Sequence, residues 1–360
     1  MKNLLYIGHA FHNKTKSSDF ILDLLSTKYS IEKFDFDPYC DGMGVFKKLS
    51  GLHFDVVILW QIMPDISKLR EYFSFDKIAF FPMYDGVPDF SDPIWSKYFE
   101  CNIINFSIAL HENCKEHGFS SQYIQYFPKP KTILNMGDEK SVFMWQRVAN
   151  INPDTIDKVL GVNNINYLYH HQAADPEQNL KLPSKKFEGK VKISTWFETK
   201  EEMDKYMQEC ALYFAPRIKE GIGMSFLEAM ASARCVIAPD FPTMNEYIKN
   251  GVTGYLYNQK KPQKIKIKNV RQIQENTMKY IEEGYKKWDE NKHKILDWIE
   301  SDYKQNSNLK LFEDTVPVAT LKQKGITLLK IKKVTSGTII SLFGILPFRK
   351  QKKGRNKNNV

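Results

Sequence analysis

The sequence has few cysteines, and their positions argue against a cross-linked or zinc-bound fold. Five cysteines occur in 360 residues, an odd number without paired spacing. Disulfide frameworks and zinc sites use regularly spaced cysteines, so we expect neither, and we expect a reducing compartment. Long apolar runs are also missing, since no stretch reaches the ~20 residues that span a bilayer. The first apolar run is short and ends at Gly8, so we expect no signal peptide.

Acidic residues are missing from the end of the chain. Residues 322–360 contain eleven lysines and arginines and no acid, whereas the whole chain has a formal charge of +10. The preceding residues are therefore nearly neutral, and overall basicity says nothing about a functional site. Residues 338–348 (TIISLFGILPF) are mostly apolar and are followed by RKQKKGRNK.

This composition favours a tail that associates with a membrane surface, with lysines on anionic headgroups. A disordered basic tail and a nucleic-acid-binding patch are the alternatives. Nucleic-acid recognition favours a basic face with interleaved aromatic residues, and the tail has an apolar block instead.

The first part of the chain alternates between strand and helix patterns. Apolar runs at residues 4–8, 55–63, 77–81, 102–106 and 122–127 predict strands, and residues 20–29, 65–72 and 111–117 predict helices. Such alternation predicts an α/β fold with a parallel, doubly wound sheet. Ligands bind such sheets at the carboxyl ends of the strands, so the loops after the strands are the ones to examine.

Two of these loops carry candidate functional side chains. His9 and His12 follow the first strand and are candidates for contacting an acceptor or a phosphate; the alternative is that they are ordinary polar loop residues. Asp85 follows the strand at 77–81, where a carboxylate can face an interdomain cleft and hold an acceptor hydroxyl. A turn aspartate before Gly86 is the alternative.

A linker around residues 127–138, with two prolines and several lysines, separates a second alternating region. Strands are predicted at 141–147, 165–170, 190–196 and 211–216. We expect four parts: an acceptor-side Rossmann-like domain at 1–132, a nucleotide-sugar-binding Rossmann-like domain at 133–268, a helical segment packing across both at 269–318, and the tail at 319–360. The helical segment has a semi-regular apolar stripe.

The densest stretch of functional residue types is 217–254. Its loop contains Glu220, Gly221 and Gly223, whose glycines permit positive φ and close approach of a ligand, and it opens into a helix near Ser225. A helix start with free N–H groups suits a diphosphate. Glu220 and Glu228 can accept hydrogen bonds from sugar hydroxyls. Alternatively, Ser225 and Glu228 form a capping box and Glu220 is a solvated loop charge.

This stretch resembles the donor site of retaining GT-B glycosyltransferases of the large family 4 type. The matching residues are Glu220, Glu228, Pro239, Glu246, Gly251 and Gly254. The resemblance implies two Rossmann-like domains with a cleft between them. It also implies that Glu228 binds the ribose and that Glu220 faces the donor sugar. The implied donor-binding set is Arg217, Gly221, Ile222, Gly223, Met224, Ser225 and Glu228.

The family also implies a pair of cations at the donor diphosphate. Arg147, at the end of the first strand of the second domain, matches the first, and we expect Glu220, Arg147 and Asp85 to be the catalytic residues. The lysine that family members carry several residues after the arginine is missing. Arg217, Lys219 or the pair His170 and His171 are the candidates for the second cation.

The expected function is transfer of a sugar from a nucleotide-diphosphate sugar to a lipid-linked glycan in bacterial surface-polysaccharide assembly. The family implies retention of configuration, and we expect metal-independent transfer without a cofactor. The tail favours a cytoplasmic protein that associates peripherally with the inner face of the cell membrane. The alternatives are a catalytically inactive nucleotide-sugar-binding or scaffold protein of GT-B fold, suggested by the missing lysine, and a nucleic-acid binder acting through its basic tail.

Overall fold

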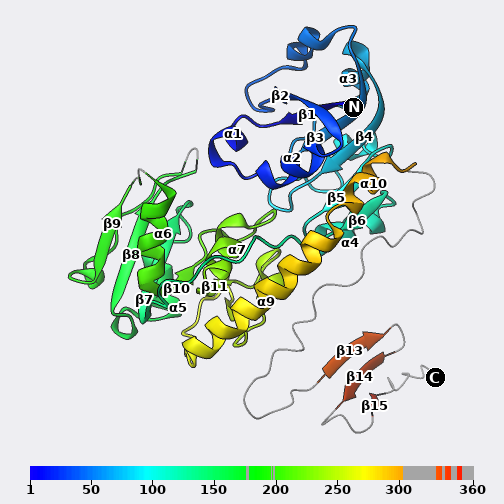
Figure 1. The fold of residues 1–360 in the computed structure, drawn as a ribbon. Coiled ribbons are helices and arrows are strands. Elements are labelled where there is room, and N and C mark those ends of the chain that lie inside the picture. The colour runs from blue at the N-terminus through cyan, green and yellow to red at the C-terminus, as the bar shows by residue number, and fades with distance from the viewer. Residues whose placement is uncertain are drawn as a thin grey trace, which may run out of the picture. The chain divides into compact units, whose positions relative to one another are not determined.

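The computed structural model describes residues 1–175, 178–195, 197, 199–302, 330–334, 337–341 and 347–350. The chain divides into two compact units, Met1–Val318 and Ala319–Val360. The first unit contains two six-stranded sheets, each with helices beside it (Figure 1).

The first sheet is parallel throughout and has the order β2-β1-β3-β4-β5-β6. Its strands are β1 (Lys2–Gly8), β2 (Tyr29–Asp35), β3 (His53–Trp60), β4 (Ser74–Phe81), β5 (Asn102–Asn105) and β6 (Ser121–Tyr123). Its helices are α1 (Phe11–Thr15), α2 (Asp19–Ser26), α3 (Ile66–Tyr72) and α4 (Ile108–Glu116), with 3-10 turns η1 (Met43–Leu49) and η2 (Pro93–Lys97). The inner strands are covered on both faces, which is why they read as continuous apolar runs.

The prediction of a helix over residues 20–29 was wrong at its end and missed a strand. Helix α2 ends at Ser26, and β2 begins at Tyr29. This strand lies at the edge of the sheet and most of its residues are exposed or half-buried, so it lacks the apolar run that marks the central strands.

The second sheet is also parallel, with the order β12-β11-β10-β7-β8-β9. Its strands are β7 (Asp138–Gln146), β8 (Tyr167–Gln172), β9 (Val191–Ser194), β10 (Cys210–Phe214), β11 (Cys235–Pro239) and β12 (Gly254–Tyr257). Its helices are α5 (Pro153–Val159), α6 (Lys200–Glu209), α7 (Met224–Ala231) and α8 (Met244–Tyr247), with 3-10 turns η3 (Val162–Asn164) and η4 (Lys185–Phe187). The predicted boundary at residue 132 lies between the two sheets.

Both sheets reverse their strand order at one place. The first sheet reverses between β1 and β3, and the second between β7 and β10. At such a switch point the loops at the carboxyl ends diverge to opposite faces and leave room for a ligand. The loops after β1, β3, β7 and β10 are therefore the positions that the topology favours for binding.

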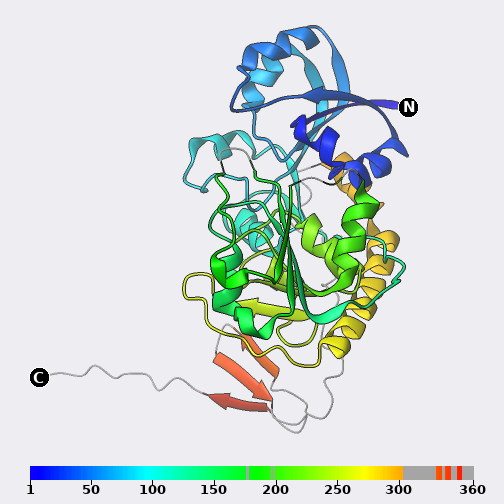
Figure 2. The ribbon, with the colours of Figure 1, turned by 90° about the vertical axis from the view of Figure 1, so that its left-hand side faces the viewer.

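Two helices close the first unit and contact both sheets. Helix α9 (Val270–Asn291) packs against α7 and β11, and α10 (Lys294–Glu300) packs against β4 and β5. Gly284 of α9 lies against the ring of Phe127, which leaves no space for a larger residue. Trp298 of α10 donates its indole N–H to the carbonyl of Ile103 at 3.2 Å. Figures 1 and 2 show α9 in yellow, leading into α10.

The second unit contains an antiparallel sheet of β13 (Lys330–Val334), β14 (Gly337–Ser341) and β15 (Pro347–Lys350), which the sequence patterns did not predict. Part of the apolar block at 338–348 and most of the basic run after it lie outside the described residues. Membrane association of this tail stays a prediction. In the part of the chain that the structure describes, no helix has both the length and the apolarity that a bilayer crossing requires.

Candidate active site

Charged side chains from both domains meet at the carboxyl ends of their strands. Asp85 follows β4 of the first sheet, whereas Arg147 follows β7, Asp175 follows β8, and Arg217 and Glu220 follow β10 of the second sheet. We call these five residues the arginine–carboxylate cluster. Parallel strands bring their carboxyl ends to one edge, so residues far apart in sequence come together there.

A single carboxylate joins the two arginines. Asp175 Oδ1 lies 2.6 Å from Arg147 Nη2 and accepts a hydrogen bond from Arg147 Nε at 2.8 Å. Asp175 Oδ2 lies 2.5 Å from Arg217 Nη2. Guanidinium groups bind carboxylate and phosphate oxygens with the same forked geometry. The two arginines therefore converge on one anionic group, which Asp175 supplies here.

The first domain contributes Asp85 to the same cluster. Its Oδ2 lies 3.4 Å from Arg217 Nη1. Its Oδ1 is buried and has no hydrogen-bond partner in the described part of the chain. A Cβ atom added to Gly221 would lie 2.8 Å from that oxygen and 2.6 Å from Met83 Cβ. The loop around Gly221 thus passes so close to the first domain that only glycine fits.

Burial raises the pKa values of two carboxyl groups of the cluster, so both are weaker acids than usual. Glu220 is 8% exposed and lies 4.0 Å from Arg217. Its burial raises its pKa to about 7; Arg217 opposes the rise and Asp85 adds to it. Burial likewise raises the pKa of Asp85, against the attraction of Arg217. A carboxyl group that titrates near neutral pH is typical of a functional site.

Helix α7 begins beside the cluster without a side-chain cap. Its N-cap is Gly223, with φ 82°, and the helix starts at Met224. The alternative of a capping box between Ser225 and Glu228 was wrong, because both residues lie within the helix and its N-cap, Gly223, has no side-chain cap hydrogen bond. Of the two loop glycines, Gly223 is the one that requires positive φ. An uncapped helix start is a site for a negatively charged group.

The structure distinguishes among the candidates for the second cation. Burial lowers the pKa of His170 and of His171 to about 4, so both rings are neutral near pH 7. Lys219 lies over the ring of Tyr84, 6.0 Å from its centroid. Arg217 shares Asp175 with the first arginine, and it is therefore the cation that the geometry pairs with it.

The two loop histidines lie on the first domain, at its switch point. His9 Nε2 is 3.4 Å from Asp37 Oδ2, and His12 Nδ1 is 2.7 Å from Ser17 Oγ. Burial lowers the pKa of His12. Among the described residues, neither histidine has a hydrogen bond or ion pair to the arginine–carboxylate cluster. Their role in acceptor or phosphate binding stays a prediction.

Gln61 is a residue that the sequence analysis did not identify. It follows β3 at the same switch point. Its Nε2 lies 3.7 Å from a Cβ placed on Gly86, next to Asp85. Its φ of 66° is in the left-handed region, which a residue with a side chain seldom adopts. The sequence feature that could have identified Gln61 is its position, as a polar residue directly after a central strand.

Glu246, which matches a family glutamate, binds the first domain in this structure. Its carboxylate accepts hydrogen bonds from Ser107 Oγ at 2.8 Å and from the backbone N–H groups of Ile108 at 2.9 Å and Ala109 at 3.1 Å. It therefore caps α4 from the other domain. Glu246 joins the two domains through these contacts.

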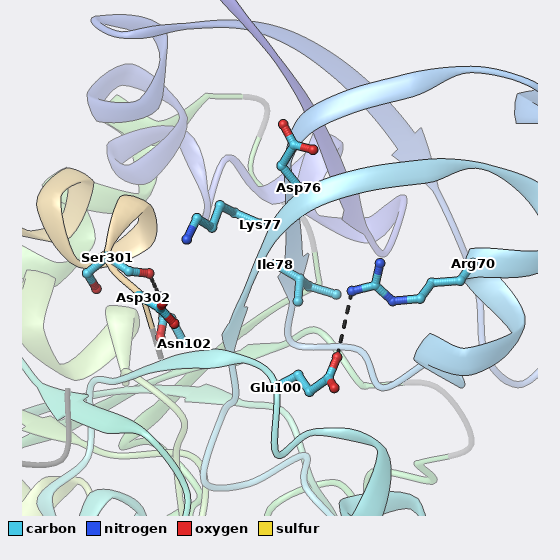
Figure 3. Close-up of a pocket in the computed structure, with 8 residues that line it drawn as sticks. All are labelled: Arg70, Asp76, Lys77, Ile78, Glu100, Asn102, Ser301 and Asp302. Atoms are coloured by element: carbon cyan, nitrogen blue, oxygen red, sulfur yellow. Dashed lines mark hydrogen bonds and ion pairs between the residues drawn. The ribbon is translucent and has the colours of Figure 1, made fainter. Parts of the chain in front are cut away.

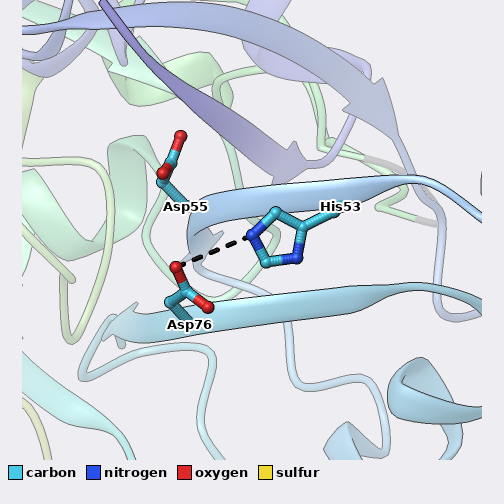
Figure 4. A group of neighbouring side chains, drawn as sticks. All are labelled: His53, Asp55 and Asp76. Atoms are coloured by element: carbon cyan, nitrogen blue, oxygen red, sulfur yellow. Dashed lines mark ion pairs between the residues drawn. The ribbon is translucent and has the colours of Figure 1, made fainter.

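Other polar groupings lie outside the cluster. Asp35, the last residue of β2, and Asp37 have the Asp-x-Asp spacing but are engaged locally: Asp35 accepts hydrogen bonds from Asn13 at 3.0 Å, and Asp37 accepts one from the backbone of Tyr39 at 2.9 Å. The amino ends of the first sheet carry a second grouping, in which His53 Nε2 lies 3.6 Å from Asp76 Oδ2 with Asp55 nearby (Figure 4).

A pocket of about 110 Å³ adjoins this second grouping, and Figure 3 shows its lining. Its lining residues are Arg70, Asp76, Lys77, Ile78, Glu100, Asn102, Ser301 and Asp302. Asp76 and Lys77 belong to the start of β4, so the pocket lies at the opposite end of that strand from Asp85. It is not part of the candidate active site.

Comparisons with known proteins concern the fold of the chain and the sequence of its second domain. Residues 161–300 match the family model described as glycosyl transferases group 1. No curated protein matches the sequence. Among solved structures, sucrose-phosphate synthase from Thermosynechococcus elongatus superposes with a TM-score of 0.51 at 12% identity, covering 86% of this chain and 94% of that one.

Two further structures are similar at lower scores. Anabaena HepE, solved with UDP and glucose, has a TM-score of 0.47 at 12% identity, covering 86% of this chain and 96% of that one. TarM from S. aureus has a TM-score of 0.47 at 15% identity, covering 72% of this chain. The alignment spans 58% of TarM. The two parallel sheets have the arrangement of the GT-B glycosyltransferases, and residues 161–300, about two fifths of the chain, are similar to the glycosyl transferases group 1 family.

Proposed function

We propose that this protein is an active glycosyltransferase that moves a sugar from a nucleotide-diphosphate sugar to an acceptor hydroxyl. The observation that carries the proposal is the convergence of Arg147 and Arg217 on one carboxylate. The family match includes Asp175 and Arg217 and begins after Arg147. A pair of guanidinium groups in this arrangement suits a diphosphate, because each presents its donors to the same small volume.

In this proposal the donor diphosphate takes the place of the Asp175 carboxylate. Negative charge develops on the diphosphate as the bond to the sugar breaks, and both arginines and the uncapped start of α7 stabilise it. Glu228 binds the ribose hydroxyls and Glu220 faces the donor sugar, as the family resemblance implies. The solved structure of HepE contains UDP, and we propose UDP as the nucleotide here.

The acceptor hydroxyl approaches from the side of the first domain. Asp85 is the candidate to hold it, because this carboxylate belongs to the first domain and reaches the cluster with one unpaired oxygen. Its pKa is raised by burial, which makes it a better proton acceptor than an ordinary aspartate. We further propose retention of configuration, transfer without a metal ion or cofactor, and the cytoplasmic face of the membrane as the site of action.

The tail supports the proposal of a lipid-linked glycan acceptor of bacterial surface-polysaccharide assembly. An apolar block next to a basic run is suited to an anionic membrane surface, where such an acceptor would be held. The experiment therefore includes several lipid-linked glycans as acceptors.

The test is release of nucleotide from a panel of nucleotide sugars, with lipid-linked glycans as acceptors. We expect UDP release that depends on the acceptor, and a loss of about tenfold or more in UDP affinity for Arg147→Met and for Arg217→Met. Arg70→Met, at an exposed ion pair of the first domain, is the matched control.

Two results would contradict the proposal. Tight UDP binding without turnover of any donor would identify the chain as an inactive nucleotide-sugar-binding protein. Salt-sensitive binding to nucleic acid, lost when residues 322–360 are removed, would support the nucleic-acid alternative instead.

A further inference from the structure

The second domain has a groove at the end opposite to the arginine–carboxylate cluster. Its volume is about 570 Å³. Glu139 and Lys140, at the start of β7, line it, whereas Arg147 follows the end of the same strand. These ends are roughly 25 Å apart, given the rise per residue of a strand. The groove is therefore separate from the candidate active site, and its volume is in the range of small-molecule sites.

The lining combines an apolar floor with a basic rim. The apolar surface of the floor comes from the half-buried Ile265 and Ile267, next to the buried Leu160, Ile165, Leu212 and Val270, and the rim carries Lys140, Lys264, Lys266 and Lys268, all exposed. The two isoleucines of the 264–268 segment pack against the core of the domain. The groove thus has one surface suited to hydrocarbon and another suited to an anion.

The alternating sequence Lys-Ile-Lys-Ile-Lys produces this division. Residues 264–268 form no helix or strand, but the segment is tied to the domain near each end. The Ile265 N–H donates to the carbonyl of Val159 at 2.8 Å, and the Lys268 N–H donates to the hydroxyl of Tyr255 at 2.9 Å. Successive side chains alternate between the core and solvent, so the isoleucines are half-buried and the lysines are exposed.

The positive charge of the rim is only partly offset within the domain, by the attraction between Lys140 and Asp138 and between Lys264 and Asp157. In the described ranges, none of the four lysines has a carboxylate within 4.0 Å, and Glu139, the one acid of the lining, pairs with Arg271 at 3.1 Å. Like charges gathered on one face repel one another and attract an anion. A ligand that suits both surfaces of the groove is an amphiphile with a negatively charged head group.

We propose that this groove binds an anionic phospholipid, with the phosphate at the lysine rim and the upper part of an acyl chain on the apolar floor. Membrane lipids of this kind present both features to a peripheral protein, and each lysine near such a surface adds to binding. The groove then anchors the second domain to a membrane independently of the basic tail. The proposal does not depend on the transferase activity.

The test uses a fluorescent reporter in the groove of the full-length protein. Asn163, exposed in the lining, is replaced by cysteine in a Cys40→Ser background and labelled with an environment-sensitive dye; the other four cysteines are buried. We expect a blue shift with vesicles containing phosphatidylglycerol and none with phosphatidylcholine alone. The same dye at Ser50, exposed on the first domain, reports on non-specific contact.

Reversing the charge of the rim lysines tests whether lipid binding in the groove causes the blue shift. The triple variant Lys264→Glu, Lys266→Glu and Lys268→Glu should need about a hundredfold more anionic lipid for the same shift. The control triple variant Lys47→Glu, Lys48→Glu and Lys97→Glu, on the first domain, should respond like the parent protein.

Three results would overturn the proposal. One is vesicle binding without a shift at residue 163, since that outcome assigns membrane contact to the tail alone. Another is an equal loss in both triple variants. A third is a shift produced by an acidic peptide but not by vesicles. If the rim variant does not fold, the parent protein is measured at increasing ionic strength. A blue shift at residue 163 that depends on the lysines must weaken as ionic strength rises, and a shift that does not weaken would overturn the proposal.

Discussion

Replacing Glu220 with glutamine removes a titrating group from the cluster while keeping the shape of the side chain. Burial raises the pKa of Glu220 from 4.5 to about 7 in the folded protein. The folded state therefore holds a proton that the unfolded state releases between these pH values. The favourable contribution is complete below pH 4.5 and is lost as the pH rises through about 7.

The size of the effect follows from the two pKa values. Each unit of difference corresponds to about 1.4 kcal/mol, so Glu220 lowers the free energy of unfolding by about 3 kcal/mol between the lower and the upper pH limit. Glu220→Gln does not titrate. We expect the stability of the variant relative to the parent protein to increase by about that amount over the same range.

The measurement is urea unfolding of both proteins, followed by tryptophan fluorescence at several pH values from about 4 to 9. The comparison uses the change in the difference with pH, so any constant effect of the substitution cancels. Glu282→Gln, at an exposed position of α9, controls for the exchange of glutamate for glutamine. A difference between parent and Glu220→Gln that stays constant with pH would refute the assignment of a raised pKa to Glu220.

Three further predictions concern the contacts between the domains and the donor site. Gly221→Ala should lower both the melting temperature and the rate of transfer, because the new methyl group would collide with the first domain; Gly42→Ala, where a Cβ meets no atom within 4 Å, should change neither. Glu246→Ala should lower the free energy of unfolding by about 2 kcal/mol, through loss of three hydrogen bonds to α4, while UDP affinity measured by calorimetry stays close to that of the parent protein. Arg147→Lys should bind UDP more weakly than the parent protein, because lysine lacks the forked donors of arginine. An unchanged affinity would contradict the placement of the diphosphate between Arg147 and Arg217.

Much of the fold was predictable because buried parallel strands leave a simple pattern in the sequence. The central strands β3 and β4 are continuous apolar runs, and the helix after β3 begins where Asp65 caps it. Strand β2 was not predictable by the same rule, because an edge strand needs fewer apolar residues. Strands β13 to β15 likewise gave no such signal.

The candidate site was predictable where residue type and position after a strand coincide. Asp85 was predicted in this way and Arg147 and Glu220 from the family resemblance, and the structure brings all three into one cluster. Asp175 was missed, because an aspartate before a proline reads as an ordinary loop residue. Its role depends on the two arginines that reach it from β7 and β10.

The sequence by itself determined the alternation of central strands and helices and the glycine-containing loop at 221–223, and it indicated the resemblance of the second domain to glycosyltransferases. These depend on local patterns, which a chain carries along its length. Only the tertiary structure decided that Arg217 shares Asp175 with Arg147, that His170 and His171 are neutral, and that Glu246 caps a helix of the other domain. Those outcomes depend on burial and on distances between residues far apart in sequence, and both arise when the two sheets and their helices pack together.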